Sequence, residues 1–351
     1  MRARFSTSFL AVCCGLTLLV PASHAESQTA TREATQWVVP RTADGHPDFQ
    51  GNWTNATLTP VERPEGRDRI LTPEQIAQIE GRRQNLADSL SRPSDPDRPA
   101  PPAGGIGSAG AVGGYNYFYM DPGTRVAVFN GEPRSSLVVD PPDGRFPPLT
   151  PDAERLREAE TERAARFGEF DNPENLTYSD RCIRSHGSHV PLLPNYVYNS
   201  NYTIVQTSEY VVIMMEMIHD VRIIRLGERR SLPEDQHPWM GYSWGRWAGD
   251  TLVVETTNVP SSESNQQWFF PGGSDDMKVI ERFTRPDANT INYEFTVEDS
   301  ATYTGSWSGE VPFRRLDGRL YEYACHEGNY ALRHILSGAR AQEREDPGRR
   351  R

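Results

Sequence analysis

Four side chains that could carry out acid–base chemistry lie in one short stretch of the sequence, and strongly apolar residues flank them. They are Glu216, His219, Asp220 and Arg222. In an unbroken strand His219 would lie on the face opposite the other three, whereas a turn near Asp220 would change that arrangement. Two interpretations stay open. Burial of Glu216 would raise its pKa and make it a general acid or base, and pairing with Arg222 would lower its pKa and make a structural ion pair.

A further candidate for proton transfer is His326, which directly follows Cys325. If Cys325 were bonded to Cys182, His326 would lie near the loop that contains His186 and His189. Three imidazoles and a nearby carboxylate could bind a divalent metal and activate water. The two histidines of the loop are separated only by Gly and Ser, and such pairs are more often solvated than ligating. We therefore expect no metal site.

A dense aromatic group could line a binding site. It comprises Trp239, Tyr242, Trp244 and Trp247, with Arg246 among them. Large flat side chains that carry one polar atom suit small-molecule pockets, and Arg222 or Arg246 could hold an anionic group. The same aromatic side chains could instead fill one end of a barrel.

The sequence lacks the motifs of several enzyme classes. It has no G-x-S-x-G elbow, no H-E-x-x-H motif and no P-loop. The stretch 105–110 matches G-x-G-x-x-G, but a Pro-rich loop precedes it where a dinucleotide site needs a strand. We therefore expect no cofactor. The formal net charge of -11 argues against nucleic acid as a partner, because proteins that bind nucleic acid present basic surfaces.

The N-terminus has the layout of a secretory signal peptide over residues 1–25. Arg2 and Arg4 precede an apolar run from Phe9 to Val20, and cleavage is expected after Ala25. The run is shorter than the roughly 20 apolar residues of a membrane-spanning helix. We expect an exported protein, periplasmic or secreted, with no transmembrane segment in the mature chain.

Export would also decide the state of the cysteines. Removal of the signal peptide takes away Cys13 and Cys14 and leaves Cys182 and Cys325. An oxidising compartment favours a disulfide between these two. Two buried free thiols and metal ligation are the alternatives, although neither cysteine belongs to a Cys-x-x-Cys pair.

The candidate residues must be positioned by a mainly β body. Strand patterns separated by tight turn signals recur after Tyr196 with no helix between them, which predicts an antiparallel meander that closes into a lipocalin-like barrel or a sandwich. The expected strands are 115–120, 125–129, 136–139, 202–206, 210–216, 221–225, 251–256, 277–285, 290–297, 311–316 and 320–325.

Two or three helices are expected at the periphery of this body. Thr72-Pro73 and Thr150-Pro151 are helix-start patterns, and they predict helices near 73–90 and 151–167. The remaining segments are a disordered leader (26–38), a flexible loop near 91–113 and a polar C-terminal tail (331–351), so that residues 39–330 form one β-rich domain.

Three blocks of the sequence resemble a large family of exported bacterial proteins whose function is not established. The blocks are 40–53, which reads PRTADGHPDFQGNW, 239–256 and 301–307. Gly51-Asn52-Trp53 is also similar to the first strand of lipocalin-type barrels. The resemblance implies secretion and a lipocalin-like body, and it implies no particular activity.

These observations lead to two hypotheses. In the first, the protein is an exported barrel that binds an apolar or aromatic small molecule in its interior, with Met214, Met215, Met217 and the tryptophans as walls. In the second, the same barrel is a cofactor-independent hydrolase, lyase or isomerase that uses Glu216 with His219 or His326 for proton transfer. The fold alone does not distinguish them, because barrels host both functions.

Overall fold

The structure is a computed structural model. It describes residues 37–91, 97, 120–166, 170–184, 189–195, 197–233, 235–261 and 273–345. Several predicted features lie outside these residues: the signal peptide, residues 26–36 of the leader, the G-x-G-x-x-G stretch, most of the loop near 91–113, the strand at 115–119 and His186.

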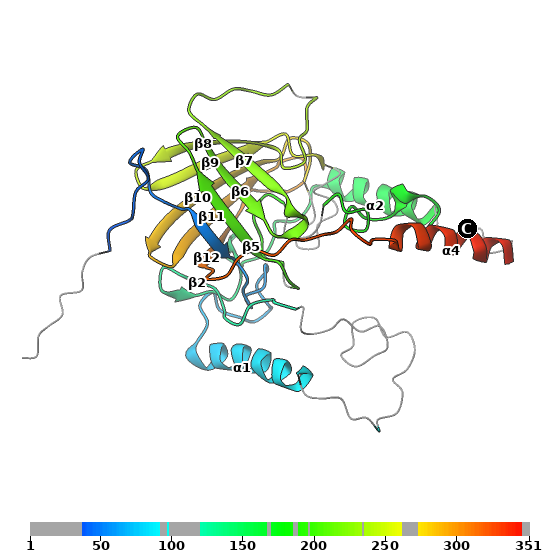
Figure 1. The fold of residues 1–351 in the computed structure, drawn as a ribbon, viewed down its shortest axis with the longest axis horizontal. Coiled ribbons are helices and arrows are strands. Elements are labelled where there is room, and N and C mark those ends of the chain that lie inside the picture. The colour runs from blue at the N-terminus through cyan, green and yellow to red at the C-terminus, as the bar shows by residue number, and fades with distance from the viewer. Residues whose placement is uncertain are drawn as a thin grey trace, which may run out of the picture. The chain divides into compact units, whose positions relative to one another are not determined.

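Nine strands form a closed barrel (Figure 1). Closure occurs at β1, where Trp53 pairs with Tyr202 of β5 on one side and with Arg315 of β12 on the other. All neighbouring strands are antiparallel except β7 and β8, which run parallel over a short overlap. This confirms the predicted mainly β fold. The strands are β1 (Gly51–Thr54), β5 (Asn201–Gln206), β6 (Tyr210–Met215), β7 (Val221–Leu226), β8 (Tyr242–Ala248), β9 (Thr251–Thr257), β10 (Lys278–Asp287), β11 (Thr290–Glu298) and β12 (Trp307–Arg315).

Short strands and helices surround the barrel. Strand β4 (Val138–Asp140) pairs with the start of β12, and β2 (Val128–Phe129) and β3 (Glu132–Pro133) form a hairpin. The helices are α1 (Pro73–Leu90), α2 (Pro151–Arg166) and α4 (Ala331–Glu345), with 3-10 turns at Pro173–Asn175 and Met217–His219. Helix α4 lies in the segment expected as a polar tail. None of the helices in the described ranges is long and apolar enough to cross a membrane.

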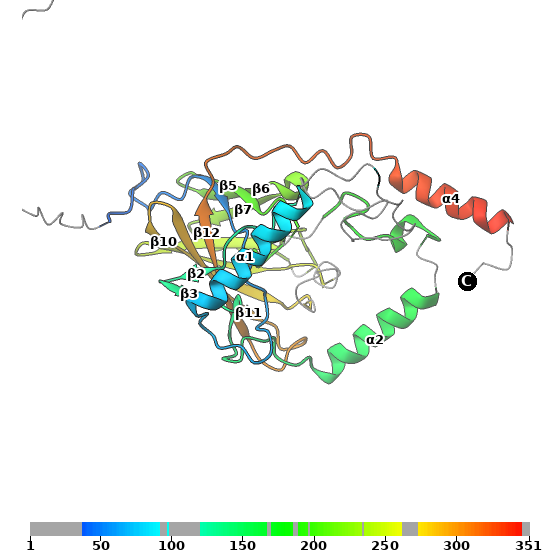
Figure 2. The same cartoon turned by 90° about the horizontal axis from the view of Figure 1, so that it is seen from below.

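Helix α1 begins where its sequence predicts. The Thr72 hydroxyl accepts a hydrogen bond from the Gln75 amide at 3.3 Å, the Gln75 side chain accepts one from the Thr72 amide at 2.9 Å, and Pro73 occupies the first helical position. Residues at its start contact the β2–β3 hairpin, since the Leu71 amide donates to the Pro133 carbonyl at 2.9 Å. The helix therefore lies beside the hairpin (Figure 2).

Strand predictions differ from the structure in several places: of the predicted strand 125–129 only Val128–Phe129 is a strand, and its hairpin partner β3 was not predicted. Residues 320–325 form no strand, because β1 and β12 already close the barrel and leave no free edge for a further strand. Conversely, β8 was not predicted, because its dense aromatic residues pointed to a binding group or to the filling of a barrel end and not to a strand. Its inward positions are the small residues Ser243 and Gly245, both of which are buried.

Alternating side chains fill the middle of the barrel. On β11 the side chains of Ile291, Tyr293, Phe295 and Val297 are buried, whereas those between them face outward. They belong to one apolar cluster with buried members on eight of the nine strands, and the partly buried Trp247 of β8 packs against it. Its largest members on the barrel strands are Trp53, Tyr202, Phe283, Tyr293, Phe295, Trp307 and Phe313.

The chain closes one end of the barrel with its N-terminal block. Trp247 of β8 stacks on His46 and Phe49, with ring centroids 4.7 and 5.8 Å away. Arg41 of the same block forms an ion pair with Asp250 in the β8–β9 turn at 2.7 Å. Two of the three blocks that carry the family resemblance therefore meet at this end.

The opposite end is closed by residues 189–195, which we call the plug. Val190, Leu192 and Leu193 of the plug are buried in the apolar cluster. The Leu192 amide donates to the Tyr293 hydroxyl at 2.9 Å, and the Asn55 side chain donates to the Leu192 carbonyl at 3.2 Å. The plug therefore contacts the barrel interior directly.

The predicted disulfide between Cys182 and Cys325 is present. Cys182 precedes the plug in the sequence, and Cys325 follows β12 by ten residues (325 − 315), so the bond connects the plug-bearing segment to the chain that leaves the barrel. The two cysteines are 143 positions apart.

Close packing at Gly309 of β12 leads to a testable prediction. A Cβ atom at this position would lie 2.3 Å from Cζ of Phe295 and 3.1 Å from the Leu137 carbonyl oxygen. Gly309→Ala is therefore expected to lower the free energy of unfolding by about 1–3 kcal/mol in denaturant titrations. Gly305→Ala is the matched control, because nothing lies within 4 Å of its Cβ position. Equal effects of the two substitutions would contradict this packing.

Candidate functional site

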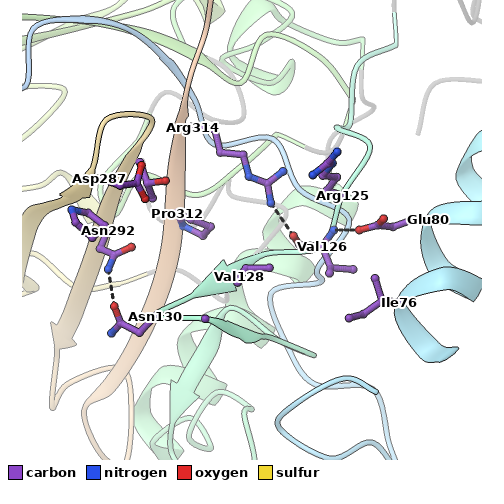
Figure 3. A pocket seen from close by; sticks show the side chains of 13 residues that line it. Ile76, Glu80, Arg125, Val126, Val128, Asn130, Asp287, Asn292, Pro312 and Arg314 are labelled. Carbon is purple, nitrogen blue, oxygen red and sulfur yellow. Dashed lines mark hydrogen bonds between the residues drawn. The ribbon is translucent and has the colours of Figure 1, made fainter. Parts of the chain in front are cut away.

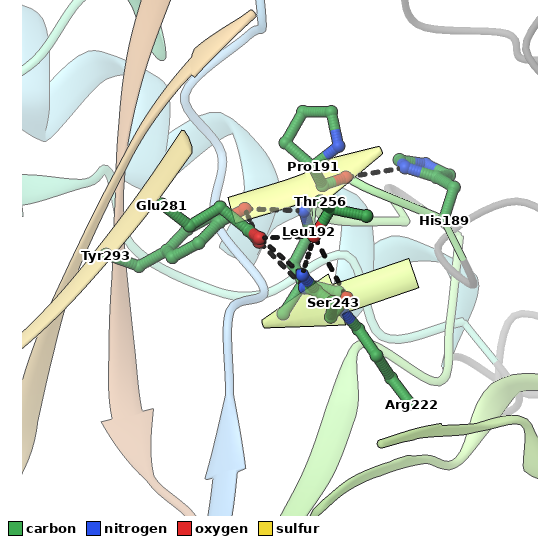
Figure 4. Close-up of polar contacts among 8 residues, drawn as sticks. All are labelled: His189, Pro191, Leu192, Arg222, Ser243, Thr256, Glu281 and Tyr293. Carbon is green, nitrogen blue, oxygen red and sulfur yellow. Dashed lines mark hydrogen bonds and ion pairs between the residues drawn. The ribbon is translucent and has the colours of Figure 1, made fainter. Parts of the chain in front are cut away.

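A network of buried polar side chains crosses the barrel interior (Figure 4). Arg222 of β7 donates through Nη1 to Oε1 of Glu281 on β10 at 2.8 Å and forms an ion pair with the same carboxylate through Nη2. Its remaining donors reach the hydroxyls of Ser243 on β8 at 3.0 Å and Thr256 on β9 at 2.7 Å. The Tyr293 hydroxyl of β11 donates to Glu281 at 2.8 Å. Five strands are linked in this way.

The electrostatics of the network favour a charged Arg222 and a neutral Tyr293. The side chains of Arg222 and Glu281 are 1% and 0% exposed. Burial tends to lower the pKa of Arg222, but the charge and hydrogen bonds of Glu281 outweigh burial and raise it. Burial, together with the Glu281 charge, raises the pKa of Tyr293 well above its ordinary value. The phenol therefore stays protonated and donates to Glu281, and the network links five strands across the barrel interior.

The proposed acid–base residues lie elsewhere. The buried carboxylate of Glu216 accepts hydrogen bonds from the side chains of Asn199 and Asn201 and from the Tyr321 amide, the last at 3.4 Å. The turn at 217–219 interrupts the strand, so Glu216 does not pair with Arg222. The ion pair considered for Arg222 exists, but its partner is Glu281, which is 59 positions away in the sequence.

The two candidate histidines are exposed. The His219 ring contacts the Tyr323 carbonyl through Nδ1 at 3.1 Å, so Glu216 and His219 lie against the same segment, which leaves the barrel after β12. His326 follows in that segment. Among the described residues, no hydrogen bond joins His326 to Glu216 or His219. The structure therefore does not assemble the three into a single constellation.

The aromatic group is divided among several places. Trp239 is half exposed and packs edge-on against Tyr178, with ring centroids 5.5 Å apart. Trp244 lies on the outer face of β8 and donates to the Gly227 carbonyl at 2.7 Å, and Arg246 is exposed. Trp247 alone packs at a barrel end, as the second interpretation of this group predicted.

Of the three methionines expected as walls of an interior site, only two are buried. Met215 and Met217 are buried, whereas Met214 faces outward. His189 is buried in the plug, with Nδ1 2.6 Å from the Pro191 carbonyl oxygen. Within the ranges that the structure describes, no three His, Cys, Asp or Glu side chains are grouped as metal ligands would be.

A groove on the outside of the barrel has the features of a binding site (Figure 3). It lies between α1, the β2–β3 hairpin and the outer faces of β11 and β12, and its volume is about 570 Å³. Its apolar walls come from four segments that are far apart in the sequence: Ile76; Val126 and Val128; Pro286; and Pro312.

Polar contacts hold these walls together. Glu80 of α1 accepts a hydrogen bond from the Val126 amide at 3.1 Å, and Arg314 of β12 donates to the Val126 carbonyl at 2.7 Å. At the far side of the groove the Asn292 side chain donates to the Asn130 side chain at 2.8 Å. The groove is therefore preformed. The groove was not predicted from the sequence, because its lining residues come from distant segments and no single segment has a recognisable binding motif.

Comparisons with known proteins yield no relative. No family model matches the chain, and neither a curated protein nor a solved structure matches it. The class of protein is therefore defined by the fold alone, as a closed nine-stranded β-barrel with peripheral helices.

Proposed function

We propose that this chain is an exported β-barrel protein that binds an apolar or aromatic small molecule in the outer groove. The ligand class is the one predicted from the sequence, but the location differs. The barrel interior is occupied by the chain's own aromatic side chains, the Arg222 network and the plug, whereas the groove is open to solvent.

The observation that carries this proposal is the combination of volume and lining in the groove. About 570 Å³ is within the range of roughly 300–1,000 Å³ that is typical of small-molecule sites. Apolar side chains from four segments form part of the walls, and polar side chains line the rest: Glu80, Arg125, Asn130, Asp287, Thr290, Asn292 and Arg314. The side chain of Val128 is 42% exposed, so the apolar surface is accessible to a ligand.

Export is the second part of the proposal. It is supported by the signal-peptide layout of residues 1–25 and by the disulfide, which is typical of oxidising compartments. Mass spectrometry of the protein recovered outside the cytoplasm is expected to give a chain that begins at Glu26, and an uncleaved chain retained in the cytoplasm would contradict export.

Groove binding can be tested with the neutral fluorescent probe N-phenylnaphthylamine. Val128→Trp fills the groove and is expected to weaken probe binding at least about tenfold, which corresponds to about 1.4 kcal/mol. Val205→Trp on the outer face of β5 is the matched control, because Val205 is 46% exposed and does not line the groove. Unchanged binding in Val128→Trp, or equal loss in both variants, would contradict the proposal.

A further inference from the structure

A second, smaller pocket adjoins the outer groove. Its volume is about 320 Å³, and it lies against the ends of β1 and β12 and the loop before β2. Arg125 and Arg314 line both the pocket and the groove, so the two cavities adjoin at these residues. Arg315 adds a third guanidinium group to the pocket. We call this cavity the arginine pocket.

The positive charges of the arginine pocket are only partly compensated by the protein. The Arg125 guanidinium has no hydrogen-bond or ion-pair partner among the described residues. Arg314 donates to the Val126 carbonyl, and Arg315 lies over the Trp53 ring at 5.8 Å. One carboxylate, Asp121, lines the pocket, and its charge also acts on Arg83 of α1. The lining of the pocket thus has three guanidinium groups and one carboxylate, and the adjoining groove adds the carboxylates of Glu80 and Asp287.

The close approach of two of these arginines has an electrostatic cost. Burial, and after it the positive charge of Arg125, lowers the pKa of Arg314, and Glu80 offsets this only in part. An anion bound between Arg125 and Arg314 would relieve their repulsion and accept charge-assisted hydrogen bonds, for which the guanidinium fork is suited. The whole chain is acidic, with a net charge of -11, so this basic pocket stands out from its surroundings.

The backbone that carries Arg125 is firmly held. The Arg125 carbonyl accepts hydrogen bonds from the Leu58 amide at 2.8 Å and from the Thr57 hydroxyl at 3.1 Å. The preceding loop packs so tightly that a Cβ atom at Gly123 would lie 2.9 Å from the backbone of Ala56. The backbone of Arg125 is therefore fixed before any ligand arrives, so that only its exposed side chain has to be ordered on binding.

We propose that the ligand carries an anionic group, a carboxylate, sulfonate or phosphate, which the arginine pocket binds while the apolar body of the same ligand lies in the groove. This inference rests on the proposed function, because it assigns the charge of the molecule that the groove would bind.

A matched pair of probes tests the inference. Anilinonaphthalene sulfonate carries the aromatic framework of N-phenylnaphthylamine with an added sulfonate. We expect it to bind at least about tenfold more tightly than the neutral probe, and its binding alone to weaken with added salt. Arg125→Gln is expected to weaken sulfonate binding at least about tenfold and to weaken binding of the neutral probe far less, because only the sulfonate needs the charge. Arg333→Gln on α4, an exposed arginine outside both cavities, is the control.

The outcomes separate the two proposals. If both probes bind equally, Arg125→Gln changes neither, and Val128→Trp still weakens both, then the anionic assignment is overturned and the groove stands. If sulfonate binding requires Arg125 but is indifferent to Val128→Trp, the arginine pocket is supported and the groove is overturned. If neither variant affects either probe, both proposals fail.

Discussion

Replacing Glu281 with leucine is expected to lower the free energy of unfolding by about 3–5 kcal/mol, because it leaves the Arg222 charge buried without a counter-charge. The loss also removes the acceptor for the Tyr293 hydroxyl. Denaturant titration monitored by tryptophan fluorescence measures the change. Glu281→Gln, which keeps the shape of the side chain, is expected to destabilise for the same reason.

A double variant tests whether the destabilisation comes from the unpaired charge of Arg222 or from the loss of the Glu281 side chain itself. Arg222→Met combined with Glu281→Leu removes both charges and is expected to recover much of the stability lost in Glu281→Leu, since a buried pair can be replaced by apolar groups at little cost. The surface pair of Lys278 and Glu298, at 2.6 Å, is the control. Glu298→Gln is expected to change stability by no more than about 1 kcal/mol. A Glu281→Leu variant as stable as Glu298→Gln would contradict the role assigned to the network.

The second large effect is expected from loss of the disulfide. The bond closes a loop of 143 positions, for which the chain-entropy description assigns about 4–5 kcal/mol. Reduction, or replacement of Cys182 and Cys325 by serine, is therefore expected to shift the unfolding transition to clearly lower denaturant concentration. The plug should be affected first, because Cys182 precedes it and Cys325 follows the last strand.

Hydrogen exchange provides the local readout for the same variant. The Leu192 amide, which donates to Tyr293 inside the barrel, is expected to exchange faster without the disulfide. Amides in the middle of β11 serve as the internal control for global opening. Identical unfolding curves for oxidised and reduced protein would contradict the prediction, and so would free thiols at both cysteines in protein from its native compartment.

Local features were predictable because they depend on short stretches of chain. The capping box at Thr72 and the alternation along β11 arise from residues that are near neighbours in the sequence. The pairing of Cys182 with Cys325 followed from counting, since only two cysteines remain after cleavage of the expected signal peptide.

The candidate sites depend on contacts that no short stretch encodes. Arg222 reaches Glu281 across the barrel, and which strands face each other there is set by barrel closure and stagger. The turn at 217–219 breaks the alternation that would place Glu216 and Arg222 on one face of an unbroken strand. The groove likewise forms only when α1, the β2–β3 hairpin and β12 come together, so its residues carried no common signal in the sequence.

The aromatic residues of β8 are close together in the sequence but lie in different places in the structure. Its tryptophans suggested either a pocket or the filling of a barrel end, and the strand places Trp244 outside and only Trp247 at the barrel end. Small inward residues made this possible, since a Cβ atom at Gly245 would lie 2.9 Å from Cγ2 of Ile224. Strand β8 instead supplies one wall of the barrel and the contact surface for the N-terminal block.

The proposed binding of a ligand on the outer wall of the barrel is tested most directly by amide chemical-shift mapping during titration with anilinonaphthalene sulfonate. The largest shifts are expected at the groove and the arginine pocket, in particular at Val126, Val128 and Arg314. The amide of Leu192, inside the barrel, should remain unshifted. Shifts concentrated at Leu192 and the Arg222 network, with none at Val126 or Val128, would place the ligand in the interior and contradict the proposal.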